Sequence, residues 1–207
     1  YEQAIYFDSK NEQAYLKLAD IYKGANPQQA IEKLEQLKSV VPSSVLADKK
    51  LAEVYYMNNR FDKASEAYAR FIHSSETTED DLVKYAFALF LNHDFEKSLE
   101  VANLGLKRNA RHAAFNRLAM YNYTDMKRYD DAQKAADAFF NAADKADYSY
   151  LDYMYYGHLL NALKKYDEAV MQYQKAIELD TSKTELWREI SNAYEQKNDY
   201  TCLLYTS

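Results

Sequence analysis

The side chains best suited to metal or acid–base chemistry are four histidines, which lie far apart in the sequence at His73, His93, His112 and His158. A zinc site needs several Cys, His or carboxylate ligands at short, regular spacing. None of the four has a second ligand at such a spacing. His93 and Glu96 are three residues apart, but they span a predicted turn and helix start. We therefore expect no metal site and no cofactor, and we assign His93 a surface or capping role.

Catalytic motifs are also missing from the sequence. It contains no glycine-rich phosphate loop, nucleophile elbow or kinase signature, and its three glycines would hardly supply one. The many carboxylates are spread over the outer faces of predicted helices, as solvated charges usually are. We therefore predict that the protein is not an enzyme, since no site for a reaction is visible.

The charge balance bears on the class of partner. The net charge is -6, and Lys and Arg are scattered among the acids. A phosphate backbone is a poor partner for such a surface, so we expect no nucleic acid. No apolar run approaches the roughly 18 residues that a membrane-spanning helix needs, so we expect no membrane insertion by the visible residues.

A fold of β-strands joined by tight turns would need many glycines and prolines, and both are rare in this sequence. We therefore expect helices to position any binding residues. A five-residue motif recurs along the chain. It has an aromatic residue among polar and acidic residues, and it ends on a small residue. The aromatic residue of this motif recurs at intervals of 34, 34, 37 and 34 residues, at Phe61, Phe95, Tyr129, Tyr166 and Tyr200. The sequence is therefore a repeat with one insertion of three residues.

A small residue keeps the same period at Ala30, Ala64, Ser98, Ala132 and Ala169. Where two antiparallel helices cross closely, a bulky side chain would hold them apart. We therefore predict that all five small residues are buried at the crossing of two helices. Apolar residues at helical spacing precede each motif, so each repeat is predicted to be a helical hairpin.

Four sequences of capping-box type fit the same period. They are Ser9-x-x-Glu12, Thr78-x-x-Asp81, Ser149-x-x-Asp152 and Ser182-x-x-Glu185. Each predicts the start of a helix.

The period and the positions of its residues resemble the tetratricopeptide repeat (TPR) family, whose unit is a 34-residue helical hairpin. The last full repeat carries the resemblance best. It has the family's large, small and turn residues at Tyr153, Tyr156, Gly157, Tyr166, Ala169, Tyr173, Ala176 and Asp180. Thr181 stands in place of the usual proline, and Asn116 stands in a slot that a large residue normally fills.

This resemblance implies an all-α fold, a right-handed superhelical α-solenoid of antiparallel helix hairpins. It covers residues 1–200. The expected repeats are a partial one at 1–11, full ones near 12–44, 45–78, 79–112, 113–149 and 150–183, and a partial one at 184–200.

The repeat pattern stops after Tyr200. Residues Cys202 to Ser207 look like the translation of a transposon-derived sequencing adapter, TGTCTCTTATACACATCT. We therefore expect 201–207 to be a non-native tail from a truncated reading frame, with no redox role for Cys202. The chain also begins at Tyr1, so we expect its natural N-terminus to be missing. Its localisation stays open, since cytoplasm and periplasm are both compatible.

The resemblance implies a scaffold that binds a protein or peptide in a concave groove lined by the first helices of the hairpins. An alternative is a regulatory or anchoring arm of a larger protein, such as an enzyme, whose other domains are missing. A pentatricopeptide-like RNA binder is opposed by the acidic charge. The Lys and Asn clamp with which some TPR domains hold a C-terminal carboxylate is approached only by Arg188 and Asn192.

Large residues left over after the packing positions are assigned predict the groove. These are Tyr56, Met57, Phe87, Phe90, Leu91 and Tyr121, with a mixed-charge rim of Lys49, Glu53, Arg117, Asp125 and His158. We expect the rings to be exposed anchors for a partner; tight superhelical curvature would instead bury them between repeats. Tyr148, Tyr150 and Tyr155 adjoin the insertion, where they either cover a widened joint or offer an aromatic contact patch.

Overall fold

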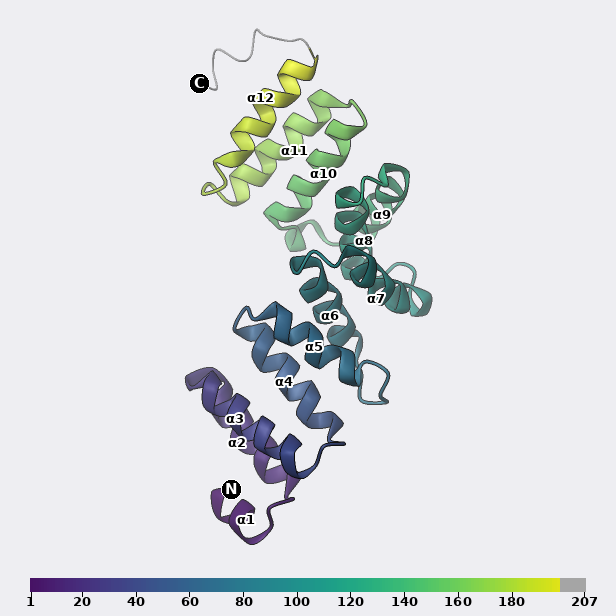
Figure 1. Ribbon diagram of the computed structural model, residues 1–207. Helices are drawn as coiled ribbons and strands as arrows, with labels where there is room; N and C mark the ends of the chain where they lie inside the picture. The colour runs from purple at the N-terminus through teal and green to yellow at the C-terminus, as the bar shows by residue number, and fades with distance from the viewer. Residues whose placement is uncertain (198–207) are drawn as a thin grey trace. The chain divides into compact units, whose positions relative to one another are not determined.

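Helical hairpins follow one another along the chain (Figure 1), in a computed structural model that describes residues 1–197. We call the first helix of each hairpin its A helix and the second its B helix. The A helices are α2 (Glu12–Ala25), α4 (Val45–Met57), α6 (Glu79–Leu91), α8 (Ala113–Asp125) and α10 (Tyr150–Ala162). The B helices are α3 (Pro27–Val40), α5 (Phe61–Phe71), α7 (Phe95–Arg108), α9 (Tyr129–Ala142) and α11 (Tyr166–Leu179). Helix α1 (Glu2–Phe7) precedes them and α12 (Glu185–Lys197) follows.

Residues 1–197 contain no strand, so the predicted all-α fold is confirmed. The expected tail at 201–207 lies outside the described residues. The chain divides into an N-terminal unit, Tyr1–Val101, and a C-terminal unit, Ala102–Ser207. Each unit is described by itself below.

The five small residues of the repeat are all fully buried, which confirms the prediction made from their spacing. Each has an exposed fraction of 0% at Ala30, Ala64, Ser98, Ala132 and Ala169. Ser98 adds a hydrogen bond, since its hydroxyl donates to the Ala86 carbonyl oxygen at 2.7 Å. The polar member therefore keeps a partner in the core.

The turn between the A and B helices has one form in four hairpins. The middle one of its three residues has a positive φ of 57 to 62°, at Asn59, His93, Lys127 and Lys164. In the turn after α4 the Arg60 N–H donates to the Tyr55 carbonyl oxygen at 2.9 Å, as in a Schellman motif. His93 thus lies at a left-handed turn position, in keeping with the surface role assigned to it. The first hairpin lacks this turn because Asn26 alone joins α2 to α3 and accepts a hydrogen bond from Gln29 N–H.

Two of the four predicted capping boxes are confirmed. Thr78 with Asp81 starts α6, and Ser149 with Asp152 starts α10. The prediction at Ser9 is wrong, since the Asn11 side chain caps α2 by accepting from Ala14 N–H.

The fourth prediction, at Ser182, is also wrong. Helix α12 begins only at Glu185, and the Ser182 hydroxyl donates to Asp180 instead. In both failures a nearby Asx side chain takes over the turn, which Asn and Asp do readily.

The three-residue insertion forms a short 3₁₀ helix, Lys145–Asp147, between α9 and α10. The Tyr148 ring then lies 5.5 Å from Phe139 and 5.2 Å from Phe140. Its hydroxyl donates to the Phe140 carbonyl oxygen at 3.2 Å. Tyr148 therefore covers the joint that the insertion widens, which is one of the two roles considered for it.

Candidate functional site

The predicted groove residues differ widely in exposure. In the N-terminal unit Met57 is 59% exposed, and Tyr56, Phe87 and Leu91 are half-buried. Phe90 is only 6% exposed, so its predicted exposure is wrong. The cause is its ring contacts, which reach Phe87 at 6.1 Å and Phe95 of α7 at 5.9 Å.

Tyr121, in the C-terminal unit, is 1% exposed, so its predicted place on an open surface is also wrong. Its hydroxyl donates to Asp152 Oδ1 at 2.6 Å, and its ring stacks on Tyr155 at 4.5 Å. Both partners belong to α10. Tyr121 is therefore part of the packing between successive A helices. The sequence held the signal for this in the capping aspartate of the next hairpin.

Two predicted rim cations have a similar structural task. Lys49 of α4 pairs with Asp81 at 2.7 Å and donates to the Glu76 carbonyl oxygen at 2.9 Å. Arg117 of α8 pairs with Asp152 at 2.8 Å. Each cation thus ties its A helix to the start of the next A helix, and we call these two arrangements the A-helix ties.

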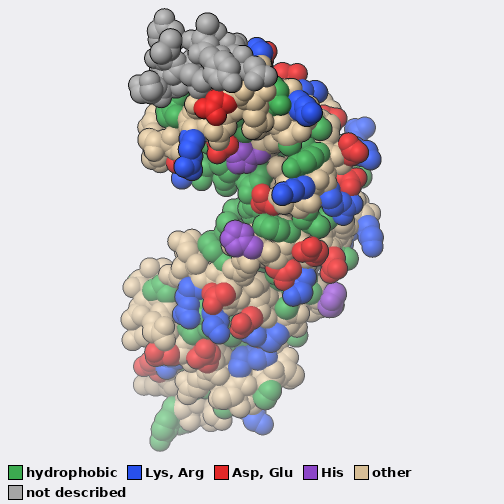
Figure 2. All heavy atoms as spheres, turned by 45° about the horizontal axis from the view of Figure 1, so that its top comes forward, with side chains coloured by type: hydrophobic (Ala, Val, Ile, Leu, Met, Phe, Trp, Pro, Cys, Tyr) green, Lys and Arg blue, Asp and Glu red, His purple; other side chains and the backbone are tan. Residues whose placement is uncertain are grey.

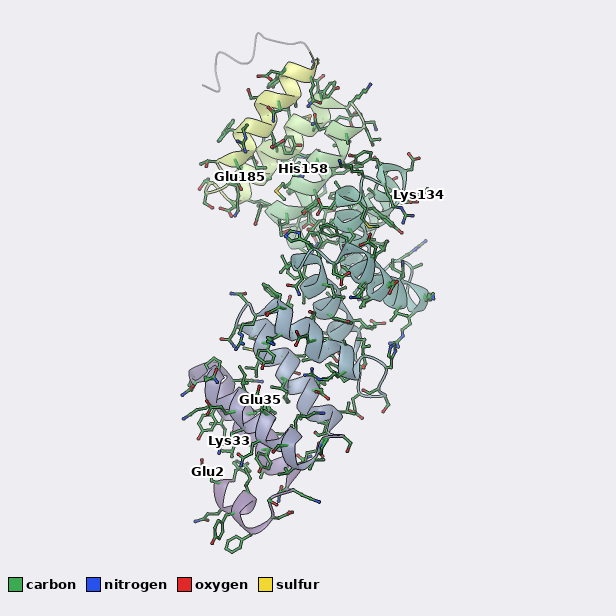
Figure 3. All side chains as sticks on the ribbon, viewed as in Figure 1. Glu2, Lys33, Glu35, Lys134, His158 and Glu185 are labelled. Atoms are coloured by element: carbon green, nitrogen blue, oxygen red, sulfur yellow. The ribbon has the colours of Figure 1, made fainter. Side chains whose placement is uncertain are left out.

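The remaining rim residues are also engaged. Glu53 accepts a hydrogen bond from Lys50 at 3.3 Å. Asp125 accepts one from the Tyr155 hydroxyl at 3.0 Å. His158, on α10 and labelled in Figure 3, is half-buried with its ring centroid 5.6 Å from that of Tyr173. Burial lowers the pKa of His158, against the opposing charges of Glu189 and Asp125, so its imidazole is neutral at pH 7.

A pocket of about 520 Å³ opens beside His158 in the C-terminal unit. We call it the His158 pocket. Its lining residues are Tyr129, His158, Asn161, Ala162, Lys164, Tyr166, Tyr173, Glu189 and Gln196. Of these, the sequence had pointed only to His158 as a binding residue. The others come from two hairpins and α12, and a single sequence gives no signal that they meet.

Three oxygen-bearing groups of this pocket lack partners among the described residues. The Tyr173 hydroxyl is fully buried without a hydrogen bond, and so is Asn161 Oδ1. The half-buried Glu189 carboxylate forms no hydrogen bond or ion pair with residues 1–197. Buried polar groups are normally satisfied, so these groups leave hydrogen-bonding capacity beside the pocket for water or a ligand.

Gly157 explains how Tyr173 reaches the pocket. A Cβ atom at this position would lie 2.5 Å from the Tyr173 ring, closer than carbon atoms approach. The ring therefore occupies the space that a side chain would fill on α10. Burial raises the pKa of Tyr173, so its hydroxyl stays protonated and able to donate.

The N-terminal unit has a pocket of about 310 Å³ between α2 and α4, but its charges satisfy one another. Lys50 Nζ lies 2.9 Å from Asp20 and 3.3 Å from Glu53. Lys23 adds a second contact to Asp20 at 3.3 Å. A pocket with such internal pairs offers a ligand little unpaired charge.

Three wider features concern the surface charge, the clustering of metal-ligating side chains and the length of apolar helices. Figure 2 shows basic and acidic side chains side by side on the face in view. Within residues 1–197 no group of three or more His, Cys, Asp and Glu side chains is placed to hold a metal ion. No helix of that part of the chain is long and apolar enough to cross a membrane.

Two segments of the chain match known protein-family profiles. Residues 13–44 match a family profile described as tetratricopeptide repeat, and residues 157–198 match one described as TPR repeat. No curated protein sequence matches the chain.

Solved structures share the fold. The chain is 13% identical to YrrB, described as a TPR protein with an unusual peptide-binding site, with a TM-score of 0.72 over 91% of this chain and 96% of that one. A MamA structure is 18% identical, with a TM-score of 0.67 over 91% and 94%. MamA from Desulfovibrio magneticus RS-1 is 15% identical, with a TM-score of 0.65 over 79% and 91%. The two profile matches show that this chain contains tetratricopeptide repeats, and its helical-hairpin fold is the one found in solved TPR structures.

Proposed function

We propose that the protein is a scaffold that binds a segment of a partner protein along its A helices, and that the His158 pocket is a principal contact. The observation that carries this proposal is the buried, unpartnered hydroxyl of Tyr173 in a pocket of about 520 Å³. A ligand that supplies the missing hydrogen bond gains binding free energy, because this hydroxyl is unpaired in the free protein.

The chemistry of the pocket suits a peptide. The Tyr173 hydroxyl is a donor, and Asn161 Oδ1 is an acceptor. A peptide backbone presents both a carbonyl oxygen and an N–H group along an extended segment. Because a hydroxyl also accepts hydrogen bonds, the two unpartnered groups can pair with polar groups of a peptide in its backbone or in its side chains.

A second contact surface of the scaffold lies in the N-terminal unit. Met57 is exposed beside the half-buried Tyr56 of α4, and Phe87 and Leu91 are half-buried on α6. Aromatic and thioether side chains offer a large apolar area at small entropic cost. We therefore propose that these four side chains anchor the partner segment, whereas Phe90 and Tyr121 belong to the core.

The fold gives general support, because stacked helical hairpins of TPR type present extended surfaces for protein segments. The peptide-binding site named for YrrB is a property of that protein. At 13% identity it shows only that the same fold accommodates such a site.

Blocking the pocket tests the function. Ala162 lines the pocket and is exposed, so Ala162→Trp fills the opening without disturbing the core. Met171→Trp, at an exposed position of α11 outside the lining, is the matched control. Binding to an array of random peptides should be lost in Ala162→Trp and kept in Met171→Trp, both with the parent melting temperature. Equal binding by all three proteins would contradict the proposed site.

A further inference from the structure

The unpartnered groups of the His158 pocket share one chemical property, which is that they accept hydrogen bonds. Glu189 contributes a carboxylate, Asn161 an amide oxygen and Tyr173 a hydroxyl oxygen. Among residues 1–197 the only cation in the lining is Lys164, an exposed residue that makes no ion pair with Glu189. The pocket therefore has a half-buried negative charge without a positive partner among the described residues.

Aromatic rings complete the lining. Tyr129 and Tyr166 are half-buried in the pocket, and no cation of the described residues lies over either ring. Four other tyrosines among residues 1–197 do carry one: Arg60 over Tyr55, Arg128 over Tyr123, Lys175 over Tyr153 and Lys183 over Tyr150. An arginine or lysine side chain from outside would find the same contact here.

We propose that the His158 pocket binds the cationic side chain of an arginine or lysine in the partner segment. Glu189 forms the ion pair, and Asn161 Oδ1 and the Tyr173 hydroxyl oxygen accept further N–H groups. Tyr129 and Tyr166 provide the ring contacts. The inference rests on the proposed function, and it adds the class of residue that the partner must carry.

The neutral state of His158 fits this occupant. A neutral imidazole does not repel a bound cation, and burial keeps His158 uncharged at pH 7. The groups that face His158 are Glu189 from α12, Asp125 from α8, Tyr155 from its own helix, and Tyr173 from α11. Acidification that protonates His158 adds a positive charge beside the site, so binding of a cation should weaken as the pH falls.

Small probes test the subsite without knowledge of the partner. The full chain is titrated with N-acetyl-arginine N-methylamide, its lysine analogue and its neutral citrulline analogue, and binding is followed by NMR of the His158 imidazole. Saturable shifts are expected with the arginine and lysine probes and not with citrulline. Equal shifts with citrulline, or no shift with any probe, would overturn the proposal.

Matched variants locate the charge. Glu189→Gln should weaken the arginine probe about tenfold, since it removes a charge-assisted contact. Glu178→Gln, an exposed acid of α11 outside the lining, should leave the affinity unchanged. Equal affinities for the two variants would contradict a role for Glu189. Thermal unfolding of both variants checks that each is folded.

The peptide array separates this inference from the proposed function. If peptides bind and Ala162→Trp abolishes binding, but bound sequences show no enrichment of arginine or lysine, the cation site is wrong and the scaffold function stands. If no peptide binds the parent chain, the proposed function itself fails. Enrichment of basic residues that disappears in Glu189→Gln supports both.

Discussion

In both units a basic residue of one A helix pairs with the capping aspartate of the next A helix. The residue at the neighbouring groove position differs between the units. In the N-terminal unit Lys49 reaches the capping Asp81 of the next A helix and the carbonyl oxygen of Glu76. The nearby groove position in α4 is Glu53, which is half-buried and pairs with Lys50. The tie there consists of one cation and one carboxylate.

In the C-terminal unit Arg117 reaches the capping Asp152 and the carbonyl oxygen of Asp147 at 2.8 Å. The groove position equivalent to Glu53 is Tyr121, whose hydroxyl donates to the same Asp152. Asp152 is 0% exposed and also accepts from Ser149. The comparison shows that an aromatic at a groove position becomes core when the next capping carboxylate can accept its hydroxyl.

Removal of the shared carboxylate should have the largest effect. Asp152→Ala leaves Arg117 and the buried Tyr121 hydroxyl without their partner, at a cost of about 3–5 kcal/mol of unfolding free energy. Asp81→Ala should cost less, about 2 kcal/mol, because it strands only Lys49 and one cap. Chemical denaturation measures both, with Asp130→Ala, an exposed acid, as the control. Equal losses for Asp81→Ala and Asp152→Ala would break the comparison.

The contribution of the tyrosine to the tie should be intermediate. Tyr121→Phe keeps the ring stacked on Tyr155 and removes the hydrogen bond from the hydroxyl to Asp152. Because the acceptor is a carboxylate, the loss should be about 1.5–3 kcal/mol. A stability equal to that of the parent would mean that the hydroxyl does not contribute to the tie.

The smallest change in stability is expected when either of two tyrosines at the same repeat position is replaced by phenylalanine. Tyr68 and Tyr173 are both 0% exposed, and neither hydroxyl has a partner in the described residues. Tyr68→Phe and Tyr173→Phe should each leave the melting temperature unchanged or raise the stability by up to about 1 kcal/mol.

Ligand binding distinguishes this pair. Only Tyr173 lines the His158 pocket, so only Tyr173→Phe should weaken the arginine probe. A loss of stability in either variant would indicate a hydrogen-bond partner that the account lacks.

The sequence predicted the hairpins well because each signal is local. The period of the small residues and the capping boxes at Thr78 and Ser149 depend on neighbours within one helix or one turn. It failed at Tyr121 and Phe90 because their burial depends on residues of other helices, α10 for Tyr121 and α7 for Phe90. The His158 pocket was largely missed for the same reason, since Tyr129, Tyr173 and Glu189 meet only in the folded chain.

The most direct test of a cation site is the pKa of His158, measured by NMR titration of its imidazole in the free chain and with saturating arginine probe. His158→Gln assigns the signal. Burial places the pKa of the free protein below its usual 6.5, and a cation in the pocket should lower it further. The stability that depends on neutral His158 is then complete above pH 6.5 and decreases as the pH falls toward the lowered pKa. A His158 pKa that is unchanged or raised by the bound probe would contradict the account.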